Sequence, residues 1–242
     1  MGVDERAARS KLVLFDIDGT LLNCGGRTRK PLAGALEEIY GTSGSLLEDP
    51  FAGNTDDQIV FDALIAGGVG EEKIGRLLPL AKTRYIEALE NALDGADVVL
   101  LPGVEETLER LSSIGGVRVG LLTGNWEIGA RWKLDHFDLN RFFAFGAFGD
   151  GCRDRAGLPP VALEVARRHF GESFGPEEVL IVGDTPNDVR CGRENRIEVV
   201  ALTTGFSDCD ELRDAGADWI FSDLIEAEFL LPFVRRLGGH PG

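Results

Sequence analysis

Two aspartates separated by one residue follow the first apolar run of the sequence. The run from Leu12 to Phe15 is typical of a central strand that is covered on both faces. Side chains at positions i and i+2 of a strand point the same way, so Asp16 and Asp18 are expected to emerge together where this strand ends. Two carboxylates held so close repel each other unless a proton or a cation lies with them. A hard divalent ion with oxygen ligands, such as Mg²⁺, is the expected cation.

Polar residues also follow three later apolar runs, and these could complete such a site. They are Thr123, Arg155 in the loop after its run, and Asp184 with Asp188. Ligands of open α/β sheets bind outside the carboxyl ends of the strands. We therefore expect these side chains to meet Asp16 in one pocket, although their positions in the sequence are far apart.

From residue 102 onward, apolar runs alternate with helical patterns. The expected strands cover residues 117–122, 142–148, 179–182, 197–202 and 219–221. The expected helices open near Pro102, near Trp126, at Pro159 and at Pro186, and a last one runs through Phe233. This alternation predicts right-handed βαβ units. The fold class is thus an α/β Rossmann-like parallel sheet with helices on both faces.

The segment between residues 23 and 101 has a different pattern. Residues 23–30 are rich in glycine and basic side chains and have the character of a hinge. From Pro31 to about Leu89 the apolar residues recur with helical spacing, and no strand is required. We therefore predict a catalytic core formed by residues 1–22 and 102–242, with a helical cap, residues 23–101, inserted after the first strand.

Composition narrows the classes of partner. The 41 acidic and 25 basic residues give a formal charge of −16, which disfavours nucleic acid and anionic membranes as partners. An anionic substrate must then be attracted by a local metal ion or cation. The four cysteines form no CxxC pair, and no signal-like segment opens the sequence, so we expect a cytoplasmic protein. No apolar run approaches the length that spans a bilayer.

Three motifs resemble those of the haloacid dehalogenase superfamily. Residues 15–21, Phe-Asp-Ile-Asp-Gly-Thr-Leu, resemble its first motif, and residues 122–125, Leu-Thr-Gly-Asn, its second. Residues 183–188, Gly-Asp-Thr-Pro-Asn-Asp, resemble its fourth. The likeness is to the phosphatases with a helical C1-type cap after the first strand, the group that includes phosphoglycolate phosphatase.

The resemblance implies a mechanism and a metal site. Asp16 would be the nucleophile that forms an aspartyl-phosphate, and Asp18 the general acid and base. Asp16, the backbone carbonyl of Asp18, Asp184 and Asp188 would hold Mg²⁺. Thr123, with the backbone N–H groups of Gly124 and Asn125, would donate hydrogen bonds to the phosphate.

At the third motif the sequence departs from the family, which normally has a lysine there. No lysine follows Lys133. We expect Arg155 to take this role, because its guanidinium can bind phosphate oxygens with a fixed fork. Arg153 is the competing choice.

A loop of the predicted cap is a further candidate for substrate recognition. It contains Asn54, Thr55 and Asp56, and a loop at this place in related phosphatases reaches toward the leaving group. The plain alternative is that Asn54 or Thr55 only caps the following helix.

The predicted function is a Mg²⁺-dependent phosphoric monoester hydrolase that acts on a small phosphorylated metabolite. Two alternatives stay open: a sugar phosphomutase on the same core, and a phosphoacceptor or phosphate-binding signalling module without turnover. The sequence does not identify the substrate, the geometry of cap closure, or whether the protein is a monomer or a homodimer.

Overall fold

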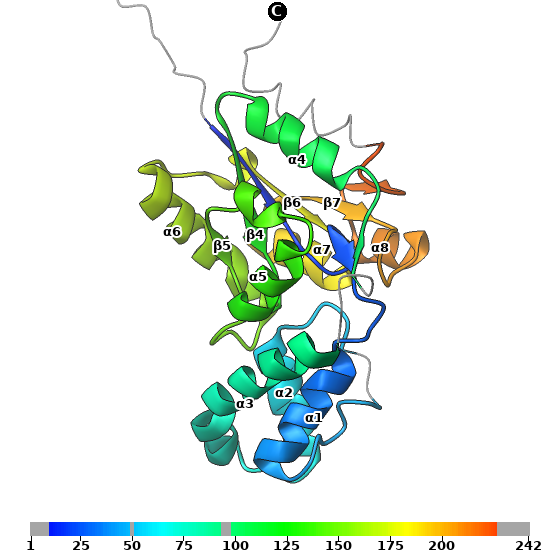
Figure 1. The fold of residues 1–242 in the computed structure, drawn as a ribbon. Coiled ribbons are helices and arrows are strands. Elements are labelled where there is room, and N and C mark those ends of the chain that lie inside the picture. The colour runs from blue at the N-terminus through cyan, green and yellow to red at the C-terminus, as the bar shows by residue number, and fades with distance from the viewer. Residues whose placement is uncertain (1–9, 49–50, 93–97, 227–242) are drawn as a thin grey trace, which may run out of the picture.

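The computed structural model describes residues 10–48, 51–92 and 98–226 (Figure 1). Within these residues, six strands form a parallel sheet in the order β5-β4-β1-β6-β7-β8. They are β1 (Lys11–Phe15), β4 (Val117–Leu122), β5 (Gly146–Ala147), β6 (Val179–Gly183), β7 (Glu198–Leu202) and β8 (Trp219–Phe221). The expected α/β fold class is confirmed.

Strand β1 lies between β4 and β6, and the register aligns the ends of all three. Phe15 pairs with Leu121 of β4 and with Val182 of β6. The residues that follow these strands therefore leave the sheet at the same edge. This alignment brings motifs from distant parts of the sequence together.

Helices cover both faces of the sheet because alternate residues of β1 point to opposite sides. Val13 and Phe15 pack in one apolar cluster with α4 (Val104–Ser113) and α5 (Glu127–Asp135). Leu12 and Leu14 pack in a second cluster on the other face. The helices of that face are α6 (Leu158–Phe170), α7 (Pro186–Asn195) and α8 (Cys209–Ala215). The four apolar side chains of β1 are fully buried, which stabilises the fold by roughly 1.5–3 kcal/mol for each large apolar side chain.

Three helices lie below the sheet in Figure 1 and have an apolar core of their own. They are α1 (Arg29–Tyr40), α2 (Asp56–Ala66) and α3 (Glu71–Ala92), and we call them the inserted helices. Leu36, Leu64 and Ile74 are fully buried in this core, and Trp126 joins it from the sheet side. The helical pattern expected for residues 31–89 is confirmed, whereas the domain limits at residues 23 and 101 stay predictions.

A short antiparallel pair at the base of the inserted helices has no counterpart in the sequence analysis. Leu22–Asn23 (β2) pairs with Val99–Leu100 (β3). Strands of two residues are too short to show an alternating pattern, and their partners are far apart in sequence. The pair holds the two ends of the inserted segment side by side.

The apolar run at residues 142–148 forms less strand than we expected. Only Gly146 and Ala147 pair with β4, while Phe142 ends a 3-10 turn, Leu139–Phe142. Phe143 and Phe145 are buried in opposite faces of the sheet, so packing accounts for the apolar residues here. The helix expected through Phe233 lies outside the described residues. None of the described helices is long and apolar enough to cross a membrane.

Candidate active site

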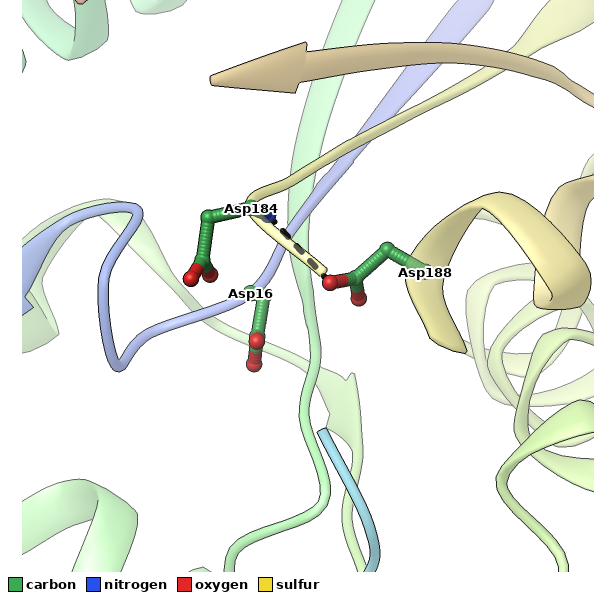
Figure 2. Close-up of side chains that lie close together, drawn as sticks. All are labelled: Asp16, Asp184 and Asp188. Carbon is green, nitrogen blue, oxygen red and sulfur yellow. Dashed lines mark hydrogen bonds between the residues drawn. The ribbon is translucent and has the colours of Figure 1, made fainter. Parts of the chain in front are cut away.

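Three aspartates meet at the carboxyl edge of the sheet, and we call them the acidic cluster. Asp16 follows β1, Asp184 follows β6, and Asp188 lies in the first turn of α7 (Figure 2). Each can place one carboxylate oxygen within 4.8 Å of the others, and all three are buried. Thr185 and Asp188 form a capping box that starts α7, which fixes Asp188 toward the cluster.

Burial and mutual repulsion make the negative charges of the acidic cluster unfavourable. Burial raises the pKa of Asp16 to about 6, although Arg155 opposes this shift. Burial, with the nearby carboxylates of Asp188 and Asp16, raises the pKa of Asp184 well above its usual range. Oδ1 of Asp16 is buried without a hydrogen-bond partner among the described residues. Buried carboxylate oxygens of this kind suit a hard divalent cation.

Other contacts hold the remaining oxygens in place. Oδ1 of Asp184 accepts a hydrogen bond from the Thr20 hydroxyl at 3.1 Å, and its Oδ2 accepts one from the backbone N–H of Phe206 at 3.2 Å. Oδ2 of Asp188 accepts one from the Thr185 hydroxyl at 2.6 Å. The cluster is therefore rigid, because each of these two carboxylates is fixed by neighbouring donors.

Arg155 is the cation that the fold brings to the acidic cluster. Its Nη2 lies 2.9 Å from Oδ2 of Asp16 and 2.5 Å from Oδ1 of Asp188. Its Nη1 donates to the backbone carbonyl of Gly53 at 2.9 Å. Only 2% of the side chain is exposed. Arg155 opens the short 3-10 turn that precedes α6.

Arg153 lies elsewhere. It is exposed, pairs with Glu71 at 3.3 Å and stacks over the ring of Phe61 at 4.2 Å. Of the two arginines left open by the sequence, the structure places Arg155 in the site. One intervening residue, Asp154, is enough to turn the two side chains to different surroundings.

A second group, which we call the Asp18 cluster, consists of Asp18, Asn125 and Lys133. The ammonium Nζ of Lys133 lies 2.8 Å and 2.6 Å from the two carboxylate oxygens of Asp18 and 2.7 Å from Oδ1 of Asn125. Nδ2 of Asn125 donates to Oδ2 of Asp18 at 2.7 Å and to the Thr123 hydroxyl at 2.9 Å. Burial lowers the pKa of Lys133, but Asp18 outweighs this effect and leaves it raised.

Lys133 is not among the site residues expected from the sequence. Its signal is a lysine at a helix position that faces the core, because its neighbours Gly129, Ala130 and Leu134 on the same helix are all buried. Helical spacing alone gives no reason for a charge there. Asp18 supplies that reason, and it comes from a strand end far away in the sequence.

The loop before α2 contacts the core directly. Thr55 caps α2 by accepting from the backbone N–H of Gln58, and its hydroxyl donates to the carbonyl of Cys152 at 2.6 Å. Thr55 therefore caps α2 and also contacts the loop at Cys152, while its role in substrate binding stays a prediction. Asp56 accepts from the backbone N–H of Trp126 at 2.7 Å. Burial raises the pKa of Asp56 to about 6, against the opposing charge of Lys133.

Asn54 and Gly124 lie beside this loop. Asn54 accepts a hydrogen bond from Asn187 at 2.9 Å. A side chain at Gly124 would meet the carbonyl of Asn54 at 2.3 Å, so only glycine allows the loop to approach the second motif so closely.

A cavity of about 340 Å³ connects the two clusters with the inserted helices. Asp16, Asp18 and Arg155 border it at the sheet, and Leu32, Ile59 and Tyr85 border it at the inserted helices. Of the predicted substrate-binding residues, Gly124, Asn125, Asn54 and Asp56 also line it. A small molecule in this cavity would touch carboxylates, an arginine and an apolar wall.

Comparison with known proteins identifies the family. The model of the haloacid dehalogenase-like hydrolase family matches residues 10–195. The chain belongs to the haloacid dehalogenase-like hydrolases. This hydrolase is 28% identical to a phosphoglycolate phosphatase of Pseudomonas syringae, over 93% of this chain and 85% of that protein. It is also 28% identical to a phosphoglycolate phosphatase of Nitrosococcus oceani, over 91% of this chain and 96% of that protein.

Solved structures agree on the fold of this hydrolase. A predicted phosphatase from Clostridium acetobutylicum matches with a TM-score of 0.69 and 21% identity, over 93% of this chain and 99% of that one. A β-phosphoglucomutase from Clostridium difficile matches with a TM-score of 0.70 and 15% identity, over 94% and 98%. The expected superfamily and enzyme class, a phosphoric monoester hydrolase, are confirmed by the family and the curated relatives.

Proposed function

We propose that this hydrolase removes phosphate from a small phosphorylated metabolite, with 2-phosphoglycolate as the first candidate. The observation that carries the proposal is the buried, unpartnered oxygen of Asp16 beside Arg155, at the end of a cavity that also reaches Asp18. The names of the relatives support the candidate substrate.

In the proposed reaction, a carboxylate oxygen of Asp16 attacks phosphorus. The bond between phosphorus and the ester oxygen breaks, and Asp18 gives its proton to the leaving oxygen. The products of this step are an alcohol and an aspartyl-phosphate. Water then attacks phosphorus while Asp18 takes the proton, and the bond to Asp16 breaks to release inorganic phosphate.

Positive charge and hydrogen-bond donors would stabilise the transferred phosphoryl group. Arg155 provides the charge and already lies 2.9 Å from the nucleophile. The hydroxyl of Thr123 and the backbone N–H groups of Gly124 and Asn125 would add donors. Asn54 and Asp56 would contact the leaving group from the inserted segment, which acts as the cap in this proposal.

The acidic cluster fits Mg²⁺ because its donors are oxygens and one of them has no other partner. Asp16, Asp184 and Asp188 would hold the ion through their side chains, and Asp18 through its backbone carbonyl. When bound, the ion neutralises charge on the phosphate oxygens. A cytoplasmic location belongs to the same proposal, and the four free cysteines support it.

A screen of phosphorylated metabolites with added Mg²⁺, measuring released phosphate, tests this function. We expect repeated turnover of at least one small alkyl phosphate. A stable phosphoprotein without release would favour the signalling alternative. Transfer of phosphate to another position of a sugar phosphate would favour a mutase.

A further inference from the structure

Lys133 borders the cavity, but its ammonium group is almost fully buried against Asp18. Only 3% of the Lys133 side chain is exposed, against 30% for Asp18. Lys133 makes three close contacts, two to Asp18 and one to Asn125, which match the three hydrogens of an ammonium group. All three hydrogens of the ammonium group are directed at protein oxygens, so Lys133 is placed to act on a substrate in the cavity through Asp18.

Fold stability alone does not explain a charge at this place. Lys133 occupies a core-facing position of α5 next to Leu134, where an apolar side chain would pack as well. Removing an ammonium from water is costly, and buried ion pairs are often no more stable than apolar residues of similar size. The lysine is therefore better explained by what it does to Asp18.

Both carboxylate oxygens of Asp18 are held in one orientation. Lys133 contacts both of them, and Asn125 donates to Oδ2 at 2.7 Å. Asn125 is in turn anchored on the Thr123 hydroxyl at 2.9 Å. Rotation of the carboxylate would break several charge-assisted hydrogen bonds at once, which are the stronger kind in proteins.

We propose that Lys133 is a positioning residue that, together with Asn125, aims the Asp18 carboxylate at the leaving oxygen of the substrate. The inference rests on the proposed function, because it assigns Lys133 to the proton transfer made by Asp18. Such a transfer requires the donor within hydrogen-bond reach of the leaving oxygen, so an unheld Asp18 would deliver its proton poorly. In this role Lys133 touches Asp18 and no atom of the substrate.

The test compares a poor and a good leaving group in Lys133→Met, which keeps the length of the side chain and removes its charge. The probes are 2-phosphoglycolate, whose leaving group needs a proton, and 4-nitrophenyl phosphate, whose leaving group does not. General acid catalysis is worth about 10²–10⁴-fold. We expect kcat/KM to fall by about 100-fold or more for the first probe and by less than about 10-fold for the second. Lys133→Arg should recover part of the loss.

Two further variants separate positioning from other roles. Lys11→Met changes another buried lysine, at the opposite end of β1, and should change both probes equally or not at all. In an Asp18→Asn background, Lys133→Met should have almost no further effect on kcat, because its target is already gone. Each variant is checked by circular dichroism and thermal unfolding. If Lys133→Met does not fold, Lys133→Gln takes its place.

Three results would overturn the role of Lys133. They are equal losses for the two probes, full activity of Lys133→Met, and multiplicative losses in the double variant. The last would mean that Lys133 acts on the substrate independently of Asp18. If the wild-type protein releases phosphate from neither probe, the proposed function itself fails, and this outcome is seen before any variant is made.

Discussion

The acidic cluster and the Asp18 cluster each contain one aspartate from the end of β1, Asp16 and Asp18, but the charges of the two aspartates are balanced differently. Asp16 is buried with two other carboxylates and one arginine, and one of its oxygens has no partner in the described part of the chain. Asp18 is partly exposed, and both of its oxygens are paired with Lys133. The first arrangement leaves room for a cation, whereas the second is already neutralised by the protein.

This difference indicates a division of work. A carboxylate with one unpartnered oxygen can bind a metal and attack phosphorus, while a carboxylate that is held but open to the cavity can move a proton.

Replacing the nucleophile should have the largest effect. Asp16→Asn removes the attacking carboxylate, so phosphate release should fall by about 10⁴-fold or more. Stopped assays of released phosphate measure it, and circular dichroism checks the fold. Asp214→Asn, an exposed aspartate on α8, is the matched control and should keep full activity. Normal turnover by Asp16→Asn would refute the role of Asp16.

Metal binding should depend on the side chains of the acidic cluster and not on the side chains of the Asp18 cluster. A chelator should reduce phosphate release to background, and Mg²⁺ should restore it. Mg²⁺ should also raise the unfolding temperature, since a ligand at about 100 times its Kd stabilises by about 2.7 kcal/mol. Asp184→Asn should lose this rise and Lys133→Met should keep it. The same rise in both variants would place the metal elsewhere.

The two arginines should differ sharply. Arg155→Ala leaves Asp16 and Asp188 without their shared cation and should lower kcat by about 10²–10³-fold. Arg153→Ala removes an exposed pair with Glu71 and should change kcat by less than about twofold. Steady-state kinetics on one substrate compare them. The reverse order would move the phosphate-binding role to Arg153.

The smallest effect should be on how the free energy of unfolding depends on pH, through the titration of Asp56 beside the Asp18 cluster. The pKa of Asp56 is raised from 3.8 to about 6, so the folded protein binds this proton more tightly than the unfolded chain does. The stability that this provides is present at low pH and is lost as the pH rises from about 4 to about 6.

Asp56→Asn removes that titration. Relative to this variant, the wild-type protein should lose less than about 3 kcal/mol of unfolding free energy between pH 4 and pH 7, at about 1.4 kcal/mol for each pKa unit. Urea unfolding at both pH values measures the difference. Parallel behaviour of the two proteins would show that Asp56 titrates normally.

Sequence patterns predicted the acidic cluster well because its members follow strands. In a parallel sheet, residues that follow adjacent strands leave at the same edge, so Asp16 and Asp184 could be matched without coordinates. The apolar run before each of them indicated a buried strand, and the helical spacing between residues 31 and 89 was equally clear. Local patterns were sufficient for these elements.

Patterns in the sequence were therefore enough to predict the fold class, the family motifs and the meeting of Asp16 with Asp184. Tertiary structure decided which arginine enters the site, since Arg153 and Arg155 have similar local sequences but different neighbours. It also decided where Lys133 lies. The helix that carries Lys133 can be predicted, but the packing of α5 on the sheet determines that this side chain faces Asp18. Periodicity reports which side chains share a face of an element, and packing between distant elements determines what that face meets.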